Sequence, residues 1–308
     1  MFVDGRNCDL KLKFIGSILV MLFAVGPILA FAAGEPENFT VLLTSFDHWQ
    51  DPVNSGVVVG TALEKSSLLA QENITVVHCK NLSSDDTTGS NAFTQTQNCL
   101  RKLKKNPDLV ISLGEGQCNK IKLETRFANT IRSGAPLDSE EGPVLPSTVP
   151  LGRMYCAGRQ IQESRKTASK SSVLQLQPSE NAGFVACNNS AFYIAKALRK
   201  LALPFGFVHV PRFSKSCHLN EASKSETVAA VEAMLVAASR EIRSRKKLGT
   251  GAEEIQPKNQ SEVVDALEKH RSESEKNCQK DFYAELLKQY SATQAAPAVD
   301  RTERRVGH

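Results

Sequence analysis

The sequence predicts an α/β protein built on a largely parallel β-sheet. Short apolar runs typical of buried strands alternate with segments whose apolar residues recur at helical spacing, and this alternation is typical of parallel sheets covered by helices. The chain has 308 residues, of which 41% are hydrophobic and 23% are charged. That length and balance are sufficient for a packed core in one large domain or two small ones.

Strand and helix candidates alternate in the first half of the chain. The strand candidates are rich in β-branched and other apolar residues and lie at 38–46 ("NFTVLLTSF"), 73–80 ("NITVVHCK") and 108–116 ("DLVISLGEG"). The helix candidates between them lie at 55–71 and 93–105. This order is the basis for expecting a largely parallel sheet.

The second half of the chain is less regular at first. Residues 130–172 contain scattered Gly, Pro and Ser, and we interpret them as long loops of the kind that form lids or walls of binding sites. Two further strand candidates follow at 181–186 ("NAGFVA") and 205–211 ("FGFVHVP"). A helix candidate at 225–247 then completes the sheet domain.

The composition changes after the predicted domain of residues 38–247. The extension 248–308 is rich in charged and amide residues. We expect a helix within 261–290 and a disordered end, because the last residues lack the apolar side chains that a packed core requires.

Residues 1–33 have the layout of a secretory signal peptide. Two lysines precede the apolar run "FIGSILVMLFAVGPILAFAAG", which is broken by a Gly-Pro pair and ends in small residues. We expect cleavage near Ala32 or Ala33 and a secreted or periplasmic protein that is not attached to a membrane. The alternative is a retained membrane anchor, since the run from Phe14 onward is just long enough to span a bilayer.

Export makes the cysteine count informative, because disulfides form in oxidising compartments. Loss of Cys8 with the signal peptide leaves seven cysteines: Cys79, Cys99, Cys118, Cys156, Cys187, Cys217 and Cys278. One thiol is left over if the other six form pairs, but the sequence alone does not assign the pairs. No Cys/His spacing indicates a zinc site.

The charge pattern argues against a nucleic-acid-binding protein. The net charge is +5, and the basic residues are dispersed without interleaved aromatic residues. A nucleic-acid-binding surface requires a concentrated basic patch.

Cys187 is the first candidate for chemistry. It ends the apolar run "NAGFVAC" and precedes an amphipathic helical segment, and the start of a helix stabilises a thiolate through its unpaired amides and its dipole. Taken alone, a cysteine in this position is more often a buried core residue or half of a disulfide. The catalytic interpretation therefore requires a nearby base.

His209 and Glu124 are the candidates for a base and its partner. His209 lies near the end of the 205–211 strand candidate, and the carboxyl ends of neighbouring parallel strands form one crevice. Glu124, in "IKLETRFAN", follows the 108–116 strand candidate and would orient the imidazole. Considered singly, His209 is more often a structural histidine and Glu124 a solvated surface residue.

Three segments of the sequence together resemble the pyroglutamyl peptidase I family of cysteine peptidases, over roughly residues 39–246. "SENAGFVACN" is similar to the nucleophile segment of that family, "GFVHVP" to its histidine segment and "LETRFAN" to its glutamate segment, in the family's order. The resemblance implies Cys187 as nucleophile, His209 as base and Glu124 as orienting carboxylate. It also implies a three-layer α/β/α sandwich with a mixed central sheet, no metal or organic cofactor, and a peptide substrate with a blocked N-terminus. Because related enzymes are often oligomeric, a homo-oligomer stays an open alternative to a monomer.

The substrate-binding segments differ from the family pattern. The resemblance implies Phe46, Trp49 and Val185 as substrate-binding residues, and Glu115 adds a carboxylate near the crevice. The family's opening motif has a second phenylalanine where Trp49 stands, and a tryptophan adds bulk and an N–H that needs a partner.

The family's oxyanion-binding arginine is also missing, since Gly134 occupies the aligned position. Arg132 is the candidate substitute, together with the backbone amides that precede the Cys187 helix. Loss of one oxyanion donor reduces turnover by on the order of a hundredfold or more.

Two functions therefore follow from the sequence. The first is an exported cysteine exopeptidase that hydrolyses N-terminal pyroglutamyl or related residues through a thioester intermediate. The alternative is a catalytically impaired secreted binding protein on the same fold, in which the altered loops and the C-terminal extension recognise a partner.

Overall fold

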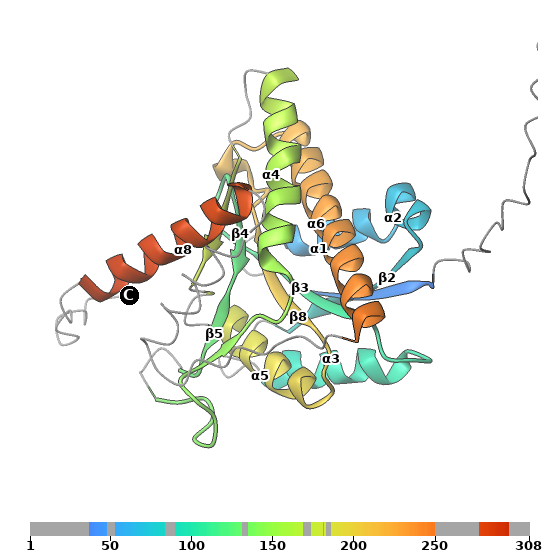
Figure 1. Cartoon of the computed structure of the whole chain (residues 1–308), viewed down its shortest axis with the longest axis vertical. Helices are drawn as coiled ribbons and strands as arrows, with labels where there is room; N and C mark the ends of the chain where they lie inside the picture. Colours follow the sequence, from blue (N-terminus) through green and yellow to red (C-terminus); the bar gives the residue numbers. More distant parts are fainter. Residues whose placement is uncertain are drawn as a thin grey trace, which may run out of the picture. The chain divides into compact units, whose positions relative to one another are not determined.

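A mixed six-stranded sheet forms the centre of the protein in the computed structural model (Figure 1). Its strand order is β2-β1-β3-β8-β4-β7. The strands are β1 (Phe39–Phe46), β2 (Ile74–Leu82), β3 (Leu109–Glu115), β4 (Lys120–Glu124), β7 (Gln175–Ser179) and β8 (Phe205–Val210). All neighbouring strands are parallel except β4 and β8, which are antiparallel. The predicted α/β class with a largely parallel, mixed sheet is confirmed.

The structure describes most of the chain after residue 36. The described residues are 37–47, 53–83, 90–130, 135–168, 174–180, 182, 186–249 and 277–295. The predicted signal peptide lies outside them. No helix in these ranges has the length and hydropathy needed to cross a membrane.

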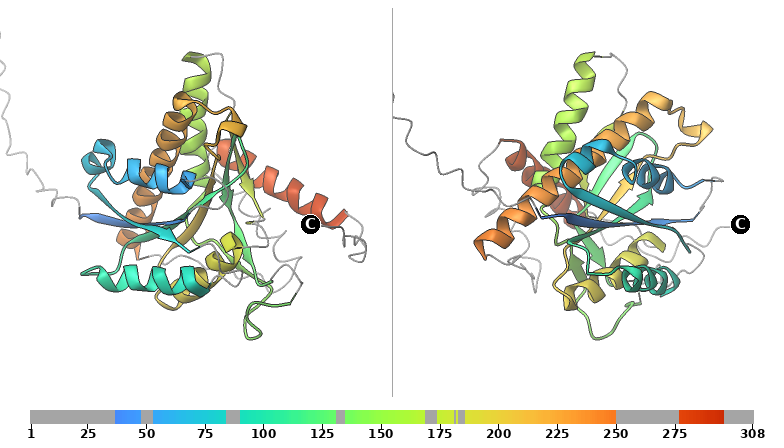
Figure 2. Two further views of the ribbon diagram at one scale, coloured as in Figure 1. Left: turned by 180° about the vertical axis from the view of Figure 1, so that it is seen from behind. Right: turned by 90° about the vertical axis from the view of Figure 1, so that its right-hand side faces the viewer.

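Helices cover both faces of the sheet, as Figures 1 and 2 show. The helices of one face are α1 (Ser55–Leu63), α2 (Ser67–Gln71), α4 (Leu151–Ala168) and α6 (Glu221–Leu248). The helices of the other face are α3 (Ser90–Lys102) and α5 (Ala186–Lys200), beside a small antiparallel sheet of β5 (Arg126–Ala128) and β6 (Val144–Pro146). A short 3-10 helix, η1 (Lys215–Cys217), precedes α6, and α8 (Asn277–Ala295) follows it in the described chain. The layers form the expected α/β/α sandwich.

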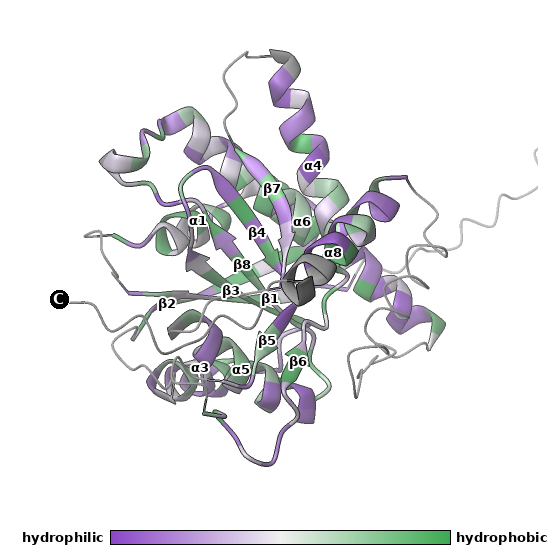
Figure 3. Ribbon diagram, turned by 90° about the vertical axis from the view of Figure 1, so that its left-hand side faces the viewer, coloured by the Kyte–Doolittle hydropathy of each residue, from purple (hydrophilic) through white to green (hydrophobic). Residues whose placement is uncertain are grey.

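Each inner strand contributes to two hydrophobic cores because successive side chains point to opposite faces. In β1, Val41 and Leu43 are buried against α1 and α6, whereas Leu42 and Phe46 are buried on the α3–α5 side. Such strands appear in the sequence as nearly continuous apolar runs, which is why β1, β3 and β8 are predictable. Figure 3 shows the hydrophobic colour running through β3 and the hydrophilic colour through much of α4.

The expectation of long loops over residues 130–172 is wrong for much of that region, since α4 occupies Leu151–Ala168. Two glycines and many polar residues obscure the periodic spacing of apolar residues that would indicate this helix in the sequence. A side chain at Gly158 would place its Cβ 2.5 Å from Met234 Cε of α6 and 2.8 Å from Leu176 Cδ2. The glycine therefore lets α4 pack closely against α6 and β7, and this packing outweighs its helix cost of about 1 kcal/mol.

Two other boundaries also differ from the sequence expectations. The predicted strand at 181–186 is wrong at its end, because Ala186 already begins α5 and the preceding strand is β7. The predicted helix at 55–71 is two helices, separated where the Ser66 side chain accepts a hydrogen bond from Leu69 N and caps α2.

Six of the cysteines form three disulfides: Cys79–Cys99, Cys118–Cys217 and Cys156–Cys278. They join β2 to α3, the β3–β4 turn to η1, and α4 to α8. Among the described residues, Cys187 is the one cysteine outside a disulfide. This pattern is compatible with a protein of an oxidising compartment.

The last described helix, α8, packs at the edge of the sheet. Phe282 and Leu286 are buried in the core, and the Phe282 ring lies 5.2 Å from the Tyr155 ring of α4. Gln289 donates a hydrogen bond to the Pro178 carbonyl of edge strand β7. Part of the predicted C-terminal extension therefore belongs to the packed structure, whereas residues 250–276 and 296–308 lie outside the described chain.

Candidate active site

The antiparallel pair β4–β8 brings Glu124 and His209 together. Lys122 lies opposite His209 and Glu124 lies opposite Phe207, so Glu124 and His209 are diagonal neighbours on one face of the sheet. Long side chains reach across such a diagonal. His209 Nδ1 and Glu124 Oε1 lie 2.8 Å apart, within hydrogen-bond distance.

Cys187 reaches the same histidine from the helix layer. It is the second residue of α5, is half-buried, and interacts with the imidazole of His209, whose pKa it raises. Glu124, His209 and Cys187 therefore form one interacting series drawn from β4, β8 and α5. The unpaired amides and the dipole at the start of a helix favour a negative charge on a sulfur placed there.

The imidazole lies beside the Phe207 ring and Gly114. The ring centroids of Phe207 and His209 lie 4.8 Å apart, and those of Phe46 and Phe207 lie 6.1 Å apart. A Cβ at Gly114 of β3 would lie 2.7 Å from the Phe207 ring and 2.9 Å from His209 Cδ2. Only glycine at position 114 leaves room for both rings.

The pKa of His209 is raised, which favours the charged form of the imidazole. Burial lowers its pKa, but hydrogen bonds to Cys187 and Glu124, reinforced by their charges, outweigh burial and raise the pKa to about 9. A histidine with this pKa holds a proton at neutral pH. That protonation state is the product of moving a proton from a thiol to an imidazole.

Glu124 is fully buried at 0% exposure, and it meets the histidine with one oxygen only. Its Oε2 has no hydrogen-bond partner among the described residues. A buried carboxylate is costly unless an opposite charge lies beside it. The imidazolium of His209 supplies that charge.

Asn188 anchors the start of α5, a role that none of the sequence motifs above predicts. Its side-chain Nδ2 donates to Ala128 O and its Oδ1 accepts from Ala128 N, both at 2.9 Å. The amide thus pairs with β5 as a neighbouring strand would. Because Asn188 follows Cys187 directly, these two bonds hold the position of the sulfur, and the Cys-Asn pair in "VACN" is the sequence signal that indicates it.

The other expected site residues are distributed differently. Phe46 is 2% exposed and packs on Phe207. Glu115 accepts hydrogen bonds from Ser55 N and Oγ at 3.0 Å and pairs with Arg212 at 3.1 Å. Its carboxylate therefore joins β3, the start of α1 and the segment after β8.

Trp49, Arg132 and Val185 lie outside the described residues, as does Gly134. The predicted aromatic wall and the oxyanion position therefore stay predictions. Within the described ranges, no three His, Cys, Asp or Glu side chains are grouped in a way that would hold a metal ion.

Solved structures that resemble this chain include pyroglutamyl peptidases. Pyroglutamyl peptidase I from Bacillus amyloliquefaciens matches with a TM-score of 0.53 and 16% identity, over 66% of this chain and 96% of that one. A mutant pyrrolidone carboxyl peptidase from the hyperthermophile Pyrococcus furiosus matches with a TM-score of 0.52 and 18% identity, over 66% and 99% of the two chains. This chain has the fold of pyroglutamyl peptidase I.

The pyroglutamyl peptidase I fold accounts for about two thirds of the chain and nearly the whole of the matched structures. The remaining third of this chain has no counterpart in them. No family model and no curated protein matches the sequence.

Proposed function

We propose that this protein is a cysteine peptidase that removes an N-terminal pyroglutamyl or related residue from peptides. The observation that carries the proposal is the series Glu124–His209–Cys187, in which Glu124 is hydrogen-bonded to His209 and Cys187 raises the pKa of the same imidazole, placed on the fold of pyroglutamyl peptidase I. A nucleophile, a base and a group that orients the base are the minimum set for covalent catalysis of acyl transfer.

In the proposed first half-reaction, the sulfur of Cys187 attacks the carbonyl carbon of the scissile amide after its proton has moved to His209. The resulting tetrahedral oxyanion accepts hydrogen bonds from backbone amides at the start of α5. His209 then donates its proton to the leaving amine as the C–N bond breaks. The peptide leaves, and the acyl group stays on Cys187 as a thioester.

In the second half-reaction, water replaces the peptide. Neutral His209 accepts a proton from the water, whose oxygen attacks the thioester carbonyl. Collapse of the intermediate breaks the C–S bond, and the sulfur leaves as its charge is stabilised by the newly protonated histidine. Glu124 orients the imidazole throughout and stabilises its positive charge.

Three disulfides support the further proposal that the chain is exported with cleavage near Ala32 or Ala33. N-terminal sequencing of protein recovered from the secreted or periplasmic fraction tests this. We expect a first residue at 33 or 34. An intact N-terminus in the membrane fraction would instead support the retained anchor.

Turnover of a fluorogenic pyroglutamyl amide by the purified, disulfide-intact protein tests the activity. Parallel reactions contain a mild reductant, the Cys187→Ser variant, and matched alanyl and prolyl amides. We expect turnover of the pyroglutamyl amide that depends on Cys187. Turnover of other amides alone would show a changed specificity, and no turnover above Cys187→Ser would reject the peptidase proposal in favour of a binding protein.

A further inference from the structure

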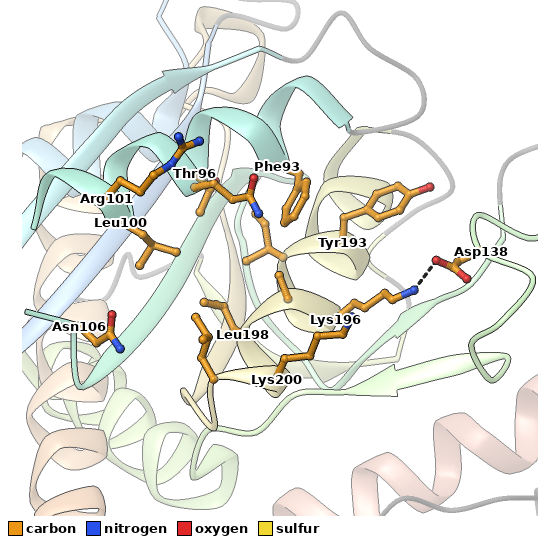
Figure 4. A pocket seen from close by; sticks show the side chains of 14 residues that line it. Phe93, Thr96, Leu100, Arg101, Asn106, Asp138, Tyr193, Lys196, Leu198 and Lys200 are labelled. Atoms are coloured by element: carbon orange, nitrogen blue, oxygen red, sulfur yellow. Dashed lines mark hydrogen bonds and ion pairs between the residues drawn. The ribbon is translucent and has the colours of Figure 1, made fainter.

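A groove of about 700 Å³ lies between α3 and α5 (Figure 4). Its volume is within the range of about 300–1,000 Å³ that is usual for small-molecule sites. None of the residues that line it is Glu124, Cys187 or His209. The groove is therefore a second site, and the proposed peptidase activity does not explain it.

The walls of the groove are mainly apolar. Phe93 of α3 and Tyr193 of α5 contribute rings whose centroids are 6.2 Å apart, and Leu100 and Leu198 extend the apolar wall. The hydroxyl of Thr96 donates to Ala92 O within its own helix, so it has no need of a ligand for its proton. Such walls favour the burial of a hydrocarbon chain.

The polar groups of the groove differ between its two parts. Tyr193 Oη donates to Leu137 O at 2.8 Å, and Lys196 forms an ion pair with Asp138, so the polar groups of this part already have partners (Figure 4). Arg101 and Lys200 are exposed and form no ion pair with any acidic side chain of the described chain. The described part of the groove thus offers two cations without a counter-ion beside an apolar wall.

We propose that this groove binds an amphipathic anion, namely an acyl chain that ends in a carboxylate. The chain would lie against the apolar side chains of α3 and α5, and the carboxylate would accept hydrogen bonds from the Arg101 guanidinium, whose planar fork matches a carboxylate. Lys200 adds a second positive charge. A ligand with a cationic head group is disfavoured by these charges, and a neutral one leaves them unused.

Calorimetric titration of the purified, disulfide-intact protein with dodecanoate, below its micellar concentration, tests the proposal. Dodecyltrimethylammonium has the same chain length with the opposite charge and serves as the matched ligand. We expect saturable one-to-one binding of dodecanoate and binding of the cation that is at least about tenfold weaker. Equal affinity for both ligands would overturn the proposal.

Two matched variants locate the site. Arg101→Gln removes a charge that lines the groove, whereas Lys102→Gln removes the same charge from an exposed neighbour that does not. We expect about tenfold weaker dodecanoate binding for Arg101→Gln and little change for Lys102→Gln. Equal effects of the two would indicate non-specific attraction and contradict the site. Circular dichroism checks that both variants are folded.

A third variant, Ala197→Trp, fills the groove. We expect it to abolish dodecanoate binding while turnover of the pyroglutamyl amide stays unchanged, because Ala197 is not part of the Cys187 series. Unchanged dodecanoate binding by this variant would also overturn the proposal. The groove and the peptidase proposal fail independently, since one is measured by binding and the other by turnover.

Discussion

Glu124 affects both the hydrogen bonding and the pKa of His209. The carboxylate is completely buried and bonded to Nδ1, so the proposed mechanism uses the other ring nitrogen for proton exchange with Cys187. The charge of Glu124 also contributes to the raised pKa of the histidine. A glutamine at position 124 has nearly the same shape as the glutamate but carries no charge. This variant therefore separates the effect of the charge of Glu124 from the effect of its packing.

For Glu124→Gln we expect kcat for the pyroglutamyl amide to fall by about 10²- to 10⁴-fold, because an amide neither stabilises the imidazolium nor enforces its orientation. The pKa of His209, followed by NMR, should fall below about 9 as the charged partner is lost. An unchanged pKa together with full activity would show that Glu124 has no orienting role.

Asn188 is the residue that we expect to hold Cys187, the proposed nucleophile, in place. In Asn188→Ala, Ala128 N and O lose their side-chain partners, and we expect the free energy of unfolding in urea to fall by about 1–3 kcal/mol. Activity should fall as well, since the start of α5 is no longer tied to β5. The exposed Asn106→Ala serves as control and should change stability by less than about 0.5 kcal/mol. Equal stability of the two variants would contradict the anchoring role.

At the scale of secondary-structure elements, the strand β4 decides where Glu124 lies. Its sequence, "KIKLE", alternates charged and apolar residues over only five positions, and so short a pattern is ambiguous between a strand and a loop. Insertion of β4 between β8 and β7 is what places Glu124 beside His209. The pairing of β4 with β8 depends on contacts between distant parts of the chain, such as the one between Glu124 and His209, which are 85 positions apart.

A disulfide joins the helix α8 to α4. Cys156 and Cys278 are separated by 122 residues, and loss of a disulfide that closes so long a loop costs about 2–5 kcal/mol. For the double variant Cys156→Ser/Cys278→Ser we therefore expect lower stability, together with faster amide hydrogen exchange in α8 and in β7, whose Pro178 carbonyl α8 contacts. Serine at both positions avoids a new free thiol. Unchanged exchange in β7 would show that α8 does not stabilise the sheet edge.

At the scale of the whole molecule, two buried histidines make the free energy of unfolding depend on pH in opposite directions. The folded-state pKa of His209, about 9, exceeds the ordinary value of 6.5, so its contribution to stability is lost as the pH rises through about 9. His78 lies under α1 with Nε2 bonded to Ser45 Oγ at 2.7 Å. Burial, followed by the charge of Lys80, lowers its pKa to about 4, so its contribution is lost as the pH falls from 6.5 through about 4.

We therefore expect these two groups to give the protein its greatest free energy of unfolding near pH 6.5. Urea unfolding across the pH range measures this. His209→Asn should flatten the alkaline side of the profile and His78→Asn the acidic side, whereas the exposed His218→Asn should change neither. Unaltered slopes in the first two variants would contradict the assigned pKa shifts.

The sequence by itself determined the α/β class, the strands β1, β3 and β8, and the three residue types suited to thiol catalysis. These features depend on local periodicity and on the chemistry of short segments. The odd cysteine count likewise indicated one unpaired thiol. Such signals are readable because each lies within a few neighbouring residues.

The tertiary structure decided which cysteine stays free, that residues 151–168 form a helix, and that β4 runs antiparallel to β8. It also decided that Asn188 anchors the start of α5 on β5. Each of these outcomes depends on packing or pairing between residues far apart in the chain. A local sequence pattern does not contain those energies, because they arise only when the distant partner is in place.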